Sequence, residues 1–174
     1  ALPGDGPSEP ISTLLGSAED GAADTLAPRA IAAGADRSRL HGLDAPLSVG
    51  SSEAGLVGIA ELARALDATG AKLLVLDPLA AILDVRDAHR DSEVRRALAP
   101  LQALCGERGV TILAIRHLRK SPTGDGITAG GGSIAFSAAA RAVLVAGVDR
   151  EDDTARVLAV AKCNLAARAP SLLY

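Results

Sequence analysis

The 174-residue sequence lacks methionine and tryptophan and holds only one phenylalanine and one tyrosine. Proteins that recognise single-stranded nucleic acid by stacking its bases need several aromatic platforms, so this class of binder is excluded. Because the sequence has no methionine, it has no initiator residue, and we expect either a processed chain or a fragment. The length otherwise suits one domain with its own hydrophobic core.

Basic residues and cysteines are also scarce. The net charge of −3 at pH 7 excludes an overall basic surface for phosphate backbones, so any contact with nucleic acid must be confined to a loop. The two cysteines, Cys105 and Cys163, form no Cys-x-x-Cys pair, which predicts reduced, buried thiols in a cytoplasmic protein. No apolar run approaches the ~18 residues of a membrane span, and residues 1–10 lack the features of a signal peptide.

Apolar runs and helical patterns alternate along the chain. After a loop over 1–10, the pattern predicts strands at 11–15, 39–43 (a weak one), 73–76, 110–115, 143–146 and 157–161. Between them it predicts a helix from Asp24 to a stop at Gly34, a helix over 51–69 closed by Gly70, and a short helix from Ser133 to about Arg141. A further helix is capped by Asp91 or Ser92 and buries Val94, Leu98, Leu101 and Leu104.

This order predicts one α/β domain over residues 1–174, with a mostly parallel sheet flanked by helices. The last two strands enclose the acidic turn DREDDT and are expected to form a β-hairpin. In parallel sheets, ligands bind beyond the carboxyl ends of the strands. The candidate site residues are therefore those that follow each strand, namely Glu19, Asp20, Asp77, His117 and Lys120.

Asp77 directly follows the apolar run Leu73-Leu74-Val75-Leu76. This is the pattern of a Walker B strand, in which a buried strand holds one carboxylate at the sheet edge to orient a magnesium ion and its waters. A parallel strand can also end in Asp because the acid caps the next turn. The sequence leaves these two interpretations about equal.

Glu19 and Asp20 follow the first predicted strand. A carboxylate on a rigid strand end could accept a proton from a water molecule that attacks a γ-phosphate. The alternative is an acidic helix N-terminus that complements the helix macrodipole, a role that Asp24 fits better.

The segment Arg116-His117-Leu118-Arg119-Lys120 follows the strand at 110–115. His117 could bond a terminal phosphate, and Arg119 or Lys120 could neutralise phosphate charge. The alternative is a solvated basic turn. The functional interpretation gains weight because Glu19, Asp77 and His117 all follow strands of the same predicted sheet.

Other polar clusters are weaker. The Gly-rich stretch 130–132 precedes the helix at Ser133 and favours a loop more than an anion site. Arg141, at the end of that helix, is a surface residue or a phosphate contact. His41 is expected to be structural. A further acidic cluster fits neither an EF-hand nor a zinc motif and indicates a solvated loop with a helix cap; it comprises Asp84, Asp87, His89 and Asp91.

A phosphate-binding loop of the form G-x-x-x-x-G-K-[ST] is absent from the 174 residues. The three lysines are Lys72, Lys120 and Lys162, and none follows a glycine. Taken with the missing methionine, this predicts that the sequence begins downstream of such a loop.

Several segments together resemble a known family. They are LLGSAEDGAADTLAPRAIAAGAD, LLVLDPLAAILD, DAHRDSEVRRALAPLQALCGERGVTILAIRHLRKS, GGGSIAFSAAARAVLV and VLAVAKCNLA. Their ordered combination, over about residues 10–174, is similar to the bacterial AAA-family ATPases of the RecA-like group, and most similar to the RepA-like hexameric helicase ATPases of plasmids and phages. The resemblance implies a RecA-like P-loop NTPase core whose first strand and P-loop are missing from this chain.

The resemblance also implies roles for individual residues. By analogy, Glu19 is the catalytic base, Asp77 the magnesium-binding aspartate and His117 the sensor of the terminal phosphate. Arg141 matches the arginine finger given to a neighbouring subunit, and Lys162 matches a basic residue near the same interface. Lys120 is expected to contact the nucleotide, and loop 119–132 to contact DNA inside a ring.

Three functions follow as hypotheses. The first is an ATP- and Mg²⁺-dependent motor of a homo-oligomeric, hexameric ring, a DNA helicase or replication or recombination ATPase that is cytoplasmic and not membrane-bound. The second is a regulatory or scaffold domain that kept the fold without a P-loop. The third is an unrelated α/β domain whose acids at the strand ends are coincidental.

Overall fold

The computed structural model describes residues 9–43, 45–49, 57–83, 90–118 and 134–174. The chain forms two compact units, each with its own sheet: the first comprises residues 1–84 and 97–116, and the second comprises residues 85–96 and 117–174. The predicted loop at 1–10 lies outside the described residues except for Glu9 and Pro10, which have no regular structure.

The first unit contains a four-stranded sheet in which every neighbouring pair is parallel. The strand order is β2-β1-β3-β4, with bounds β1 Thr13–Ser17, β2 Leu40–Gly42, β3 Leu73–Asp77 and β4 Thr111–Ala114. All four strands were expected from the sequence, with ends displaced by one or two residues. The predicted parallel sheet is confirmed.

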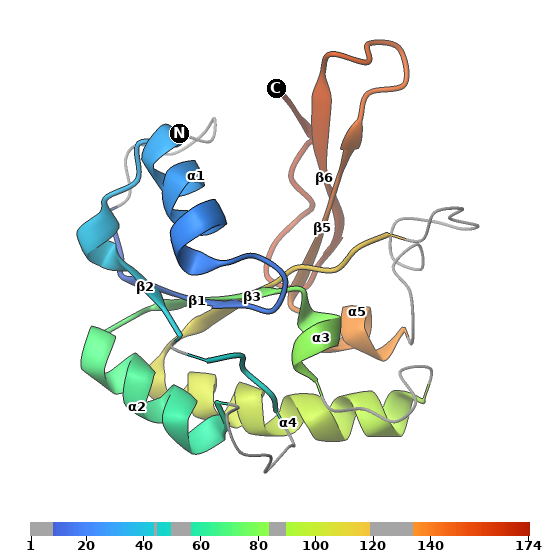
Figure 1. Ribbon diagram of the computed structural model, residues 1–174. Coiled ribbons are helices and arrows are strands. Elements are labelled where there is room, and N and C mark those ends of the chain that lie inside the picture. Colours follow the sequence, from blue (N-terminus) through green and yellow to red (C-terminus); the bar gives the residue numbers. More distant parts are fainter. Residues whose placement is uncertain (1–8, 44, 50–56, 84–89, 119–133) are drawn as a thin grey trace. The chain divides into compact units, whose positions relative to one another are not determined.

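Helices cover both faces of this sheet (Figure 1). One face carries α1, and the opposite face carries α2 and the C-terminal half of α4. The bounds are α1 Ala27–Ala32, preceded by one π-helical turn at Ala22–Leu26, a 3-10 turn at Arg37–Arg39, α2 Ile59–Thr69, α3 Leu79–Ile82 and α4 Asp91–Arg108. The short helix α3 was not predicted.

The core forms because strand and helix periodicities bring apolar side chains to a common layer. On β1 and β3, the alternate residues Leu14, Gly16, Leu74 and Leu76 are buried. Packing around Gly16 is tight, because a Cβ atom there would lie 3.3 Å from the Leu76 side chain, which would have to shift by a few tenths of an ångström. The helices supply buried leucines at helical spacing, which are Leu62 and Leu66 on α2 and Leu98, Leu101 and Leu104 on α4.

The end of α2 agrees with the sequence, but its beginning does not. Gly70 has a φ of +61°, the left-handed conformation expected of a glycine that terminates a helix. The helix begins at Ile59 because Gly58 is extended, and Val57 forms an isolated parallel bridge with Leu47. Residues 51–56, which were also predicted to be helical, lie outside the described residues.

Strand β4 is less buried than its apolar sequence predicts. Its side chains are mostly exposed, and Leu113 retains 46% of its surface. Within the described part of the chain, β4 pairs with β3 alone. An apolar run is typical of a strand whose two faces are both buried, and the described residues cover neither face of β4 fully.

The second unit contains the predicted hairpin. Strands β5 (Ala142–Val148) and β6 (Arg156–Cys163) are antiparallel, and β7 (Leu172–Leu173) adds a short third strand. Helix α5 spans Ala135–Ala139, and its predicted cap Ser133 lies outside the described residues.

The two cysteines differ in burial. Cys105 is buried, as expected, and burial raises the pKa of its thiol. Cys163 is only half-buried, so the expectation of burial is wrong there. Hydrogen bonds from the backbone N–H groups of Leu165 and Ala166 lower the pKa of the Cys163 thiol. Both thiols are free of disulfides.

Among the described helices, none is both long and apolar enough to pass through a lipid bilayer.

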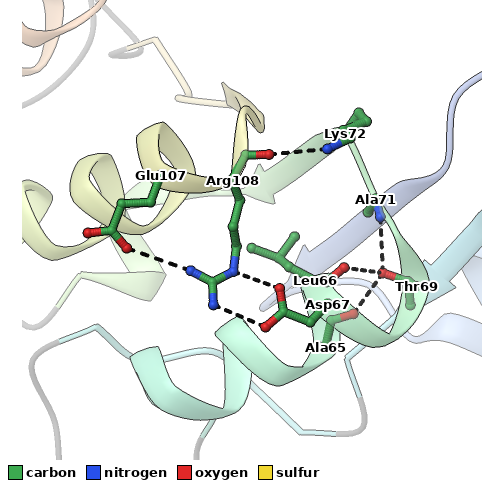
Figure 2. Close-up of polar contacts among 8 residues, drawn as sticks. All are labelled: Ala65, Leu66, Asp67, Thr69, Ala71, Lys72, Glu107 and Arg108. Carbon is green, nitrogen blue, oxygen red and sulfur yellow. Dashed lines mark hydrogen bonds and ion pairs between the residues drawn. The ribbon is translucent and has the colours of Figure 1, made fainter.

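A cluster of polar contacts joins α2, α4 and the residue before β3 near the amino end of that strand (Figure 2). Arg108 donates two hydrogen bonds to Asp67, from Nε to Oδ1 at 2.8 Å and from Nη2 to Oδ2 at 3.0 Å. Lys72 Nζ donates to the Arg108 carbonyl at 3.2 Å. The Arg108 guanidinium holds the pKa of Asp67 below its ordinary value of 3.8.

Leu74→Ala is expected to destabilise the first unit strongly, because Leu74 is fully buried in the central strand and truncation leaves a cavity. The expected loss is about 2–5 kcal/mol in the free energy of unfolding, measured by urea denaturation followed by circular dichroism. Leu113→Ala is the matched control on the exposed strand and should cost less than about 1 kcal/mol. Equal losses would contradict the core described above.

The Asp67–Arg108 pair makes stability depend on pH in a defined direction. Since the folded-state pKa of Asp67 is depressed, its contribution is fully present above the ordinary value of 3.8 and disappears as the pH falls through the lower folded value. Wild type should therefore exceed Asp67→Asn in thermal stability above about pH 5, and the difference should vanish in strong acid. Glu107→Gln is the control, because Glu107 lies 3.8 Å from the same guanidinium and is mostly exposed, so its loss should have little effect.

Candidate functional site

The carboxyl ends of β1 and β3 lie side by side. The two strands pair in parallel, so that Ser17 is the register partner of Asp77. The pairing continues one residue further, because the Ala18 N–H donates to the Asp77 carbonyl at 2.9 Å. Glu19 follows at once. The sheet thus brings two of the predicted residues, Glu19 and Asp77, to the same edge.

The turn after β1 is held by side chains as well as backbone. The Asp20 N–H donates to Ser17 Oγ at 3.0 Å, which closes the turn around Glu19. Arg29 of α1 donates from Nη1 to Asp20 Oδ2 at 2.7 Å. Asp20 is therefore engaged in an ion pair, and the exposed residue Glu19 lies within the turn that these bonds close.

The helix-capping interpretation of these acids is wrong. The π-helical turn begins after Gly21, and the acid in its first turn is Asp24. Neither Glu19 nor Asp20 lies in the first turn, so complementing a helix dipole does not explain them. Likewise, Pro78 occupies the N-cap of α3, and no side chain caps that helix.

The end of β3 is fixed by its neighbours. The Ile115 N–H donates to the Leu76 carbonyl, and the Leu79 N–H donates to the Ile115 carbonyl, both at 2.9 Å. These bonds hold the chain on either side of Asp77 and Pro78, whose peptide bond is cis. The Asp77 carboxylate is half-buried and makes no hydrogen bond or ion pair with any described residue.

This environment suits magnesium rather than a metal that the protein encloses. Magnesium retains several waters and binds through one or two carboxylates together with substrate phosphates. Over the described ranges, there is no group of three or more His, Cys, Asp or Glu side chains that could hold a metal ion. Asp77 is a single, water-accessible carboxylate, which fits the first description. Of the acidic cluster at 84–91, Asp84, Asp87 and His89 lie outside the described residues.

His117 comes two residues after Ile115 and is exposed. His117 begins the stretch 117–174 of the second unit, whereas β1 and β3 belong to the first unit. The site at the ends of β1 and β3 is therefore described without His117. The preceding Arg116 is half-buried, and burial lowers the pKa of its guanidinium. Lys120 and loop 119–132, predicted to contact the nucleotide and DNA, lie outside the described residues.

His41, which was expected to be structural, lines a cavity of about 380 Å³ on the α1 side of the first unit's sheet. The remaining walls come from β1, β2, the turn at Arg37–Arg39 and the π-helical and α1 segments. The cavity adds no residue to the set at the end of β1 and β3.

Arg141 and Lys162 lie close together in the second unit. Arg141 sits between α5 and β5 and is exposed. Lys162 is on β6, and its Nζ donates to three backbone carbonyls at the end of α5, those of Ser137 at 2.9 Å, Ala138 at 3.0 Å and Ala140 at 2.8 Å. The sequence gave no sign of these bonds, because they join residues more than 20 positions apart.

The sequence analysis also missed two residues that shape the turn around Glu19. Ser17 and Arg29 fix that turn through Asp20. A serine three residues before an aspartate is a recognisable turn signal, but it is too common to single out. The pairing of Arg29 with Asp20 depends on where α1 packs and has no local signature.

Residues 1–123 match a family model described as "AAA domain". The chain belongs to this AAA domain family. The matched region contains β1 to β4 together with Glu19, Asp77 and His117, and it ends before Arg141 and Lys162. No match is found among curated proteins.

Solved structures give the fold. The chain is similar to a KaiC-like protein from the hyperthermophilic archaeon Pyrococcus horikoshii, with a TM-score of 0.59 and 19% sequence identity. The similarity covers 94% of this chain and 76% of that one. The predicted RecA-like α/β fold is therefore confirmed, with a mostly parallel sheet flanked by helices and a separate antiparallel sheet.

Proposed function

We propose that this AAA-domain chain is the core of an ATP-hydrolysing motor. The observation that carries the proposal is the in-register pairing of β1 with β3, which ends with Ser17 beside Asp77 and so brings Glu19, two residues further on, to the same carboxyl end of the parallel sheet. This edge is where ligands of such sheets bind. The family membership agrees with the assignment.

In this proposal the two carboxylates differ in role because they differ in surroundings. Asp77 is half-buried on a rigid strand end and would hold Mg²⁺ through the ion's water shell. The ion would supply positive charge to the β- and γ-phosphates as negative charge develops in the transition state. Asp77 itself needs no proton transfer, since an ionised carboxylate is the form that binds the cation.

Glu19 is proposed as the general base. Its carboxylate accepts a proton from a water molecule, the water oxygen bonds to the γ-phosphorus, and the electron pair of the broken P–O bond leaves with ADP. The chemistry requires a base held in one position. The bonds of Ala18 to Asp77, of Asp20 to Ser17 and of Arg29 to Asp20 supply that rigidity.

The 174 residues contain no phosphate-binding loop of the form G-x-x-x-x-G-K-[ST], which an ATPase of this kind would need. We propose that a preceding strand–loop–helix unit supplies it. The isolated chain is then expected to hydrolyse no ATP. A start codon directly before Ala1 would instead favour the alternative function, a regulatory or scaffold domain that kept the fold.

The finer assignment extends the resemblance to RepA-like helicases. His117 would sense the terminal phosphate, with Lys120 and Lys162 as further basic contacts. Arg141 would act on the nucleotide of a neighbouring subunit in a homo-oligomeric ring, and loop 119–132 would contact DNA. The exposure of Arg141 supports this, since a residue that acts across a subunit interface must reach the surface.

Glu19→Gln should lower kcat for ATP by about 10²–10⁴-fold, because the amide cannot accept the proton. The measurement is steady-state phosphate release by the polypeptide that carries this chain together with its P-loop. Asp24→Asn is the control on a nearby exposed acid that takes no part in holding the turn around Glu19, and it should change kcat less than about threefold.

If Glu19→Gln retains wild-type turnover, Glu19 is not the base. If Asp24→Asn lowers kcat as much as Glu19→Gln does, the loss is not specific to Glu19.

Arg141→Ala should abolish most turnover, and mixing should reveal where the arginine acts. Loss of an arginine finger costs about 10³–10⁵-fold in related phosphoryl-transfer enzymes. Rings assembled from Arg141→Ala and Glu19→Gln subunits should regain activity, since each ring then contains sites with an intact base facing an intact arginine. Mixed rings with no recovered activity would place Arg141 within its own subunit's site or outside any site.

A further inference from the structure

Lys162 donates three hydrogen bonds to backbone carbonyls at the end of α5. A lysine ammonium has three N–H donors, and all three are used here. Their acceptors are the carbonyls of Ser137, Ala138 and Ala140, at distances between 2.8 and 3.0 Å. The residue is half-buried, and the bonds to Ser137 and Ala140 are partly shielded from water.

The three carbonyls mark the point where the chain changes direction. Ser137 and Ala138 belong to the last turn of α5, where helical carbonyls lack intrahelical partners. Ala140 is extended, with φ −75° and ψ 143°. The ammonium therefore bonds to the backbone on both sides of the bend, and its positive charge is favourable at a helix C-terminus.

Arg141 is the next residue after this bend. Its own carbonyl accepts from the Asn164 N–H at 2.9 Å, and the register pairs Ala142 with Cys163. The backbone of Arg141 is thus held by Lys162 on one side and by Asn164 on the other, both from the end of β6. Its guanidinium makes no polar contact with any described residue.

We infer that Lys162 is a positioning residue, which fixes the direction in which Arg141 leaves the α5–β5 junction by binding the carbonyls of that bend. This inference rests on the proposed role of Arg141 as the arginine that acts across the subunit interface. It also replaces the role proposed above for Lys162, a basic contact of the nucleotide, with that of a residue that positions Arg141. An ammonium whose donors are all engaged would have to break three charge-assisted bonds before it could bind a phosphate.

The clamp can be tested on the 174-residue chain without any activity assay. Limited acetylation followed by mass spectrometry compares the three lysines of one molecule. Lys162 should react several-fold more slowly than Lys72, which is exposed and donates to a single carbonyl. Equal reactivity of these two lysines would overturn the inference.

Lys162→Met tests the same clamp in the backbone, because it keeps the chain length and removes the donors. Amide hydrogen exchange of peptides covering residues 135–142 and 164 should rise by roughly tenfold, with little change in the first unit. Lys162→Arg, which retains donors, should restore part of the protection. Unchanged exchange in Lys162→Met would show that the three bonds hold nothing in place.

Turnover of the P-loop-containing polypeptide then distinguishes positioning from direct contact. If Lys162 acts through Arg141, Lys162→Met lowers kcat by about 10–100-fold with KM nearly unchanged, and it adds almost nothing to Arg141→Ala. Lys162→Arg should recover part of kcat, and Lys72→Met should leave both constants unchanged. A raised KM with multiplicative losses would assign Lys162 to the nucleotide itself and overturn the inference.

Failure of the proposed function gives a different pattern. In that case Glu19→Gln and Arg141→Ala leave turnover unchanged, while the acetylation and exchange results still report whether the clamp exists.

Discussion

The parallel pairing of β1 with β3 is the constraint on which the rest of the first unit depends. One register brings Leu14 level with Leu74 and Gly16 level with Leu76 in the buried layer, and it ends with Ser17 level with Asp77. A shift by one residue would turn the buried leucines toward the other face and separate the two acids. The burial that stabilises the sheet and the placement of the candidate site therefore have the same cause.

Local polar contacts then convert two strand ends into defined positions. Asp20 is bound by Arg29 and, through Ser17, closes the turn that contains Glu19. In the second unit, Lys162 donates hydrogen bonds to carbonyls at the end of α5, directly before Arg141. In both places, the residue proposed for chemistry is exposed, and its neighbours hold the backbone.

The sequence predicted most elements because their signals are local. Leucines at helical spacing identified α4, and Gly70 identified the end of α2. It failed at the start of α2, where extended backbone at Gly58 overrides the helical pattern, and at Cys163, whose strand is only half-buried. The apolar sequence of β4 also predicts burial on both faces, whereas most of its side chains are exposed among the described residues, because an apolar run does not specify which segments will cover it.

The sequence by itself determined the α/β class and the candidate acids, since the alternation of apolar strands with helices and the acids at the ends of two strands are properties of neighbouring residues. Only the tertiary structure showed that Asp20 pairs with Arg29, because this ion pair depends on where α1 packs. It also rejected capping as the reason for Asp77 and gave Lys162 its three carbonyl partners. Such contacts join residues distant in the chain, and no local pattern encodes them.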